Sequence, residues 1–78
     1  MRGRPLNATY AYVIIDRNEQ VLEIWGSRLK VWKRCEELAG IEDKAQARWT
    51  AVESLSGTVY KAGDPYRCFT WRRMPVHR

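Results

Sequence analysis

The chain has 78 residues and a mass of 9.2 kDa, the size of one small domain, so a separate catalytic domain is excluded. Apolar residues make up 45% of the sequence, and four Trp and four Tyr supply large core side chains, which excludes a wholly disordered chain. Fourteen Lys and Arg against nine Asp and Glu give a formal charge of +5, which favours nucleic acid as the partner.

A short basic segment precedes two predicted strands. Residues 1–8 contain two Arg, one Gly and one Pro but a single Leu, so we expect a flexible arm in front of one domain at 9–76. Residues 9–15 are aromatic and β-branched, which favours a strand, and the following Asp-Arg-Asn-Glu favours a turn. Residues 20–25 alternate between two faces with a period of two. The domain is therefore expected to begin with a β-hairpin.

Two helices are predicted after the hairpin. Ser27 can cap a first helix, in which apolar residues recur at three- and four-residue spacing up to Gly40. Glycine is typical of the position just past a helix C-terminus. A second helix is predicted over residues 42–55, because Glu42 and Asp43 suit a helix N-terminus. Its narrow apolar stripe consists of Ala45, Trp49 and Val52.

The C-terminal part, residues 58–74, is predicted to form either a hairpin around Ala-Gly-Asp-Pro or one long strand. On such a strand, one face consists of Arg67, Phe69, Trp71 and Arg73. That face points either toward the core or outward, as a stacking platform for single-stranded nucleic acid. The expected fold class is α+β, a small antiparallel sheet packed on two helices in the order β-β-α-α-β, with or without one more strand.

The reactive groups of the chain argue against catalysis. The one histidine, His77, is the penultimate residue, and the adjacent acidic pairs are typical of solvated helix charges. The two cysteines, Cys35 and Cys68, are too far apart and too few for a zinc site, so we expect two buried, reduced thiols. We therefore expect a protein that is not an enzyme and has no cofactor.

The longest unbroken apolar run covers residues 10–15, far short of the roughly 20 residues that cross a bilayer. No apolar segment of a secretory signal precedes it. The expectation is a cytoplasmic protein that does not bind to a membrane.

The first residues contain the sharpest local motif. The order Arg2-Gly3-Arg4-Pro5 resembles the core of an AT-hook. A flat backbone with glycine at its centre can lie deep in a narrow minor groove, where the negative potential attracts guanidinium groups. The resemblance implies that Arg2, Gly3 and Arg4 contact A·T-rich DNA. The alternative is a basic tail without a specific role.

The order of the predicted strands and helices over about residues 12–72 gives a second indication of function. Its stretches are Val-Ile-Ile-Asp at 13–16, Trp-Gly-Ser at 25–27, Leu-Ala-Gly-Ile at 38–41, Leu-Ser-Gly at 55–57, and residues 63–69. This layout resembles the small helix-turn-helix modules that follow the catalytic domain of homing endonucleases, and related short phage and bacterial proteins. The resemblance implies that a turn at glycine presents the second helix to DNA.

In that second helix Lys44 and Arg48 would share a face, with Gln46 near the groove. The alternative is that these residues are ordinary solvated charges of a helix.

The predicted function is regulatory DNA binding, with a possible homodimer because specific sites need more surface than one such module offers. A phage-type protein-binding module that inhibits a host complex is the rival, since Trp and Arg are enriched in protein interfaces. The predicted DNA-binding residues are Arg2, Gly3, Arg4, Lys33, Arg34, Lys44, Gln46, Arg48, Arg72 and Arg73.

Overall fold

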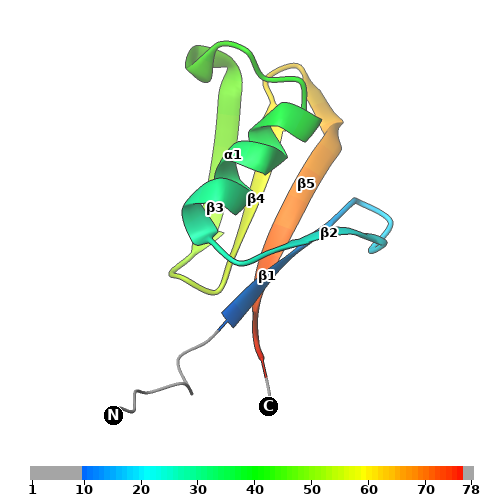
Figure 1. The fold of residues 1–78 in the computed structure, drawn as a ribbon. Coiled ribbons are helices and arrows are strands. Elements are labelled where there is room, and N and C mark those ends of the chain that lie inside the picture. Colours follow the sequence, from blue (N-terminus) through cyan, green and yellow to red (C-terminus); the bar gives the residue numbers. More distant parts are fainter. Residues whose placement is uncertain (1–9, 77–78) are drawn as a thin grey trace.

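The computed structural model describes residues 10–76 of the chain. They form one antiparallel sheet with the strand order β2-β1-β5-β4-β3, so that β2 and β3 are its two edges (Figure 1). The elements are β1 (Tyr10–Ile15), β2 (Val21–Trp25), α1 (Arg28–Leu38), a 3-10 turn η2 (Lys44–Gln46), β3 (Ala47–Val52), β4 (Ser56–Lys61) and β5 (Asp64–Pro75).

The predicted N-terminal hairpin is confirmed. The carboxylate of Asp16 stabilises its turn by accepting hydrogen bonds from the backbone N–H groups of Asn18 and Gln20, at 2.8 and 3.0 Å. The pairing of β1 with β2 shifts register between Ile14 and Ile15, which leaves Leu22 as a bulge in β2. This bulge interrupts the alternation between two faces that the sequence predicts for residues 20–25. The hairpin is strongly twisted, and β2 runs in a visibly different direction from β3 in Figure 1.

The first predicted helix is confirmed as α1. The Ser27 hydroxyl accepts from the backbone N–H of Lys30 at 3.4 Å, and Gly40 has a φ of 76° just beyond the C-terminal end. The helix packs across β4, β5, β1 and β2 on one face of the sheet (Figure 1). The described chain therefore has a helix layer on one side of the sheet.

The core lies between α1 and the sheet. Trp71 is at its centre, with edge-to-face contacts to the rings of Tyr12 and Trp32, whose centroids are 5.7 and 5.3 Å away. Phe69 and Trp25 pack against the same cluster. The face of β5 that contains Phe69 and Trp71 therefore points toward the core and is not an exposed platform. The fully buried members of the core are Ile14, Val31, Cys35, Val59 and Trp71.

The predicted second helix over residues 42–55 is wrong, and with it the fold of a sheet packed on two helices. Asp43 caps a single 3-10 turn by accepting from the backbone N–H of Ala45 at 3.0 Å. Residues 47–52 then form the edge strand β3, which pairs with β4 along its whole length. The sequence Ala-Arg-Trp-Thr-Ala-Val fits a helical stripe and also a period of two, and cross-strand pairing favours the strand. The observed order is β-β-α-η-β-β-β.

The C-terminal part forms a hairpin, one of the two predicted alternatives. Gly63 lies in the turn between β4 and β5, with a φ of 89° that suits glycine. Beyond an irregularity near the turn, Val59 lies opposite Phe69 and Gly57 opposite Trp71. No helix within residues 10–76 is long and apolar enough to cross a membrane.

Candidate nucleic-acid interface

One face of the sheet is open. Trp71 points toward α1, so its neighbours Thr70 and Arg72 point to the opposite side, and residues opposite each other on paired strands share a face. Within residues 10–76 no helix or strand covers that side. The open face consists of Arg48, Thr50 and Val52 of β3, Ser56, Thr58 and Tyr60 of β4, Cys68, Thr70 and Arg72 of β5, and Val13 of β1. Ile15 of β1 lies on the same side but is buried.

Arginine and tyrosine side chains lie together at the end of this face that is near the β1–β2 and β4–β5 turns. Arg48 is opposite Tyr60 in the β3–β4 pair, and its Nη1 atom donates to the backbone oxygens of Ala45 and Ala47 at 3.0 Å. Arg17, in the β1–β2 turn, has its guanidinium carbon 5.0 Å from the centre of the Tyr66 ring, a cation–π contact. Tyr66 is 71% exposed, so the side of its ring that Arg17 does not cover faces solvent. This end of the face combines positive charge with aromatic surface.

The middle of the open face is polar and Arg72 adds a third cation. The hydroxyls of Thr58 and Thr70 are hydrogen-bonded across β4 and β5 at 2.9 Å. Nη2 of Arg72 lies 3.4 Å from Oε2 of Glu19, an exposed pair that contributes little to stability. In the described chain, the strand positions of the open face contain no Asp or Glu. The face is therefore positive overall.

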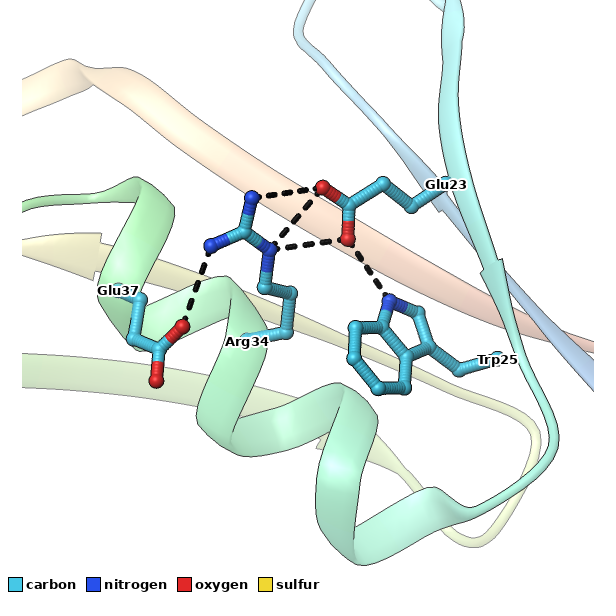
Figure 2. A network of polar contacts seen from close by, with 4 residues as sticks. All are labelled: Glu23, Trp25, Arg34 and Glu37. Atoms are coloured by element: carbon cyan, nitrogen blue, oxygen red, sulfur yellow. Dashed lines mark hydrogen bonds and ion pairs between the residues drawn. The ribbon is translucent and has the colours of Figure 1, made fainter.

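Arg34, a predicted DNA-binding residue, instead joins α1 to β2. Its guanidinium donates to both carboxylate oxygens of Glu23 at 2.7 to 3.0 Å, and Nη1 donates to Glu37 at 3.1 Å (Figure 2). Trp25 donates its indole N–H to the same Glu23 carboxylate at 2.8 Å. The hydrogen bonds from Arg34, and then from Trp25, lower the pKa of Glu23. The guanidinium of Arg34 is thus held by Glu23 and Glu37 and has a structural role.

Other predicted residues lie on the helix side. Lys33 is on the exposed surface of α1, and Lys44 in η2 has its Nζ atom 3.7 Å from Oε1 of Glu36. Arg73 lies on the helix side of β5, with its guanidinium carbon 4.1 Å from the centre of the Tyr10 ring. These cations therefore cannot act together with those of the open face on one flat ligand surface.

The predicted recognition helix with Lys44, Gln46 and Arg48 is wrong. Lys44 and Gln46 belong to η2, and Gln46 uses its backbone oxygen to accept from the N–H of Ala62 at 2.7 Å. Arg48 and Arg72 are the two predicted residues that the structure places on the open face. The predicted arm residues Arg2, Gly3 and Arg4 lie outside the described residues.

The sequence prediction missed Tyr60 on this face and the contact of Arg17 with Tyr66 beside it. Arg17 was assigned to a turn, and the tyrosines to strands without a face. The alternation of Thr-Val-Tyr-Lys at residues 58–61 contains the signal for Tyr60, because buried Val59 points to the core. Arg17 and Tyr66 are 49 positions apart, so their contact depends on tertiary structure.

The charge surplus of the chain is unevenly distributed. Residues 10–76 contain 11 of the 14 Lys and Arg and all nine Asp and Glu, which leaves a formal charge of +2 for this part. The case for a nucleic-acid interface therefore depends on where the cations lie on the open face rather than on the total charge of the chain. The three remaining cations are Arg2, Arg4 and Arg78.

Comparison of the chain with protein-family models, with curated proteins and with solved structures gives no match. The fold and the open face define a small α+β domain with a helix on one side of an antiparallel sheet. Its function is therefore inferred from the geometry of this chain alone.

Proposed function

We propose that this domain is a non-enzymatic binding protein that holds nucleic acid on the open face of its sheet. The observation that supports the proposal is the combination of Arg17, Arg48 and Arg72 with the rings of Tyr60 and Tyr66 on one uncovered surface. Guanidinium groups neutralise phosphates, and tyrosine rings stack on bases. Both parts of a nucleotide thus have a partner on this face.

A single strand fits this face better than a duplex. Bases in a duplex stack on one another, whereas unpaired bases can lie on an exposed ring such as that of Tyr66. Arg48 and Arg72 are two strands and four residues apart, a separation of about 17 Å from standard strand spacing and rise. They would therefore contact different phosphates of one strand.

The test is fluorescence anisotropy of a labelled oligothymidine with the full chain at two salt concentrations. We expect binding that weakens with salt, with a slope of log K against log salt of about −0.7 for each neutralised phosphate. Arg48→Glu and Arg72→Glu should each reduce the affinity about tenfold or more. Lys30→Glu, on the exposed side of α1, is the matched control and should have little effect.

A pair of substitutions at Tyr66 tests the stacking component. Tyr66→Phe keeps the ring and should preserve affinity, whereas Tyr66→Ala should cost roughly 1 to 3 kcal/mol of binding. Absence of binding at low salt, or an equal loss in Lys30→Glu and Arg48→Glu, would contradict the proposal.

Competition experiments show whether the domain prefers single-stranded or duplex DNA. They also test the contribution of residues 1–5. Unlabelled single strands should displace the probe more effectively than A·T-rich or G·C-rich duplexes of equal length. A chain without residues 1–5 should keep this single-strand binding and lose any preference for A·T-rich duplexes. Stronger competition by duplexes would overturn the single-strand mode.

A further inference from the structure

A groove lies on the helix side of the sheet, beside the edge strand β3. α1 packs on the more central strands, and on the β3 side Trp49 remains 48% exposed. The indole N–H of Trp49 donates to Oε2 of Glu36 at 3.1 Å, which joins β3 to the helix. The adjoining hollow of about 500 Å³ is lined by Leu29, Trp32, Lys33, Glu36 and Lys44.

The edge of β3 is available for backbone pairing. β3 pairs with β4 on one side, and no strand among residues 10–76 pairs with its other side. Every second N–H and C=O of residues 47–52 therefore points away from the sheet. An extended segment can add to such an edge as another strand, while alternate side chains enter the neighbouring groove.

The lining of the hollow combines apolar and positively charged side chains. Leu29 is 81% exposed, although it is a large apolar residue, and it lies beside the ring of Trp32. Lys33 and Lys44 border the same hollow. Its one carboxylate, from Glu36, is 13% exposed and already interacts with Trp49 and Lys44. Lys33 has no ion-pair partner among residues 10–76, so a negatively charged group can bind beside it, next to the apolar side chains of Leu29 and Trp32.

This charge distribution favours an acidic partner over a second copy of the chain. In a two-fold dimer the same patch faces itself, so Lys33 and Lys44 would approach the lysines of the other copy. Such like-charge contacts oppose association. An acidic segment would instead neutralise Lys33 and bring a further carboxylate near Lys44, beside its pair with Glu36.

We propose that this groove binds an extended acidic peptide segment of a partner protein. The segment pairs with β3, places an apolar side chain against Leu29 and Trp32, and places a carboxylate near Lys33 and Lys44. The groove lies on the helix side, and the open face lies on the other side of the sheet. The proposal therefore does not depend on nucleic-acid binding, and the two ligands can be bound together.

The test begins with selection of peptides from a phage-displayed library of random linear sequences on the full chain. We expect enriched peptides in which alternate positions carry apolar and acidic residues. Leu29→Asp, and the double variant Lys33→Glu with Lys44→Glu, should each weaken the selected peptides about tenfold or more. These side chains are exposed, so circular dichroism should show unchanged folding. Val21→Asp, at 61% exposure on the other edge strand, is the matched control and should bind as the original chain does.

Amide NMR locates the bound peptide. Addition of a selected peptide should shift the amide signals of β3 and slow hydrogen exchange in residues 47–52. Tyr66→Ala should bind the peptide normally, which separates this proposal from the nucleic-acid one. Three results would overturn it: no enriched sequence, equal binding by Leu29→Asp, or shifts confined to the open face. A concentration-dependent dimer that Leu29→Asp dissociates would also overturn it, in favour of a second copy.

Discussion

The indole of Trp32 occupies the space that a side chain at Gly57 would need. A Cβ atom at position 57 would lie 2.5 Å from Cη2 of Trp32 and 2.6 Å from Nε1 of Trp71. The missing side chain in β4 thus allows α1 to approach the sheet closely. Within the described chain the N–H of Trp71 has no hydrogen-bond acceptor, so packing fixes this indole.

Gly57→Ala should therefore destabilise the domain. The added methyl group forces Trp32 or Trp71 to move, at a cost of about 1 to 3 kcal/mol in the free energy of unfolding. The measurement is urea unfolding followed by tryptophan fluorescence. Gly26→Ala is the control, because a Cβ atom there meets no described atom within 4 Å apart from its neighbours in the chain. Equal unfolding midpoints for the two variants would show that the contact is not tight.

The Glu23 carboxylate should make stability depend on pH. Its pKa is lowered below the ordinary 4.5 by the hydrogen bonds from Arg34 and Trp25. The stabilisation is therefore complete above about pH 4.5 and is lost as the pH falls through the lowered pKa of the folded state. Glu23→Gln should unfold at lower urea than the original chain at pH 7, and this difference should shrink in acid.

The control for that prediction is Glu37→Gln. Glu37 contacts the same guanidinium, but its side chain is 56% exposed and the pair is a surface pair within one helix. Its effect on the urea midpoint should be smaller than that of Glu23→Gln at every pH. A difference between Glu23→Gln and the original chain that stays constant down to pH 3 would contradict the assignment.

The two thiols should differ in reactivity. Cys35 is a fully buried residue of α1, and burial, followed by the charges of Glu23 and Glu36, raises its pKa to about 12. Cys68 lies partly exposed on the open face. A thiol reagent such as dithionitrobenzoate should therefore modify one cysteine rapidly in the native chain and both in urea.

Protection of Cys68 also tests the open face as a binding surface. Oligothymidine should slow the rapid modification, because Cys68 lies opposite Tyr60 on that face. In Cys35→Ser the rapid phase and its protection should remain. Rapid modification of both cysteines in the folded chain would show that Cys35 is accessible.

Removal of Glu19 should strengthen nucleic-acid binding. Its carboxylate lies 3.4 Å from Arg72, so Glu19→Gln releases that guanidinium for a phosphate. Arg72 then no longer exchanges this ion pair for its phosphate contact, so the affinity for oligothymidine at low salt should rise and the slope of log K against log salt should steepen. The control Glu42→Gln removes an equal charge from an exposed position near η2, away from Arg72, and should change the slope less. Equal slopes for the two variants would argue against a role of Arg72.

The first half of the domain could be predicted because its signals are local. Asp16 determines the turn of the first hairpin through neighbouring N–H groups, and Ser27 and Gly40 delimit α1. Residues 42–55 were mispredicted because Ala45, Trp49 and Val52 satisfy a helical spacing within a short segment. Pairing of β3 with β4 decides their conformation, and no local residue reveals that partner.

For the candidate sites, the amino-acid sequence establishes which side chains the chain contains: an excess of Lys and Arg over Asp and Glu, four tyrosines and four tryptophans. Tertiary structure decided where they lie. The register of β3, β4 and β5 placed Arg48 and Arg72 on the open face, while Arg34 became bound to Glu23. The reason is physical: the face of a strand residue depends on which partner strand pairs with it and which side the helix covers, and both are long-range contacts.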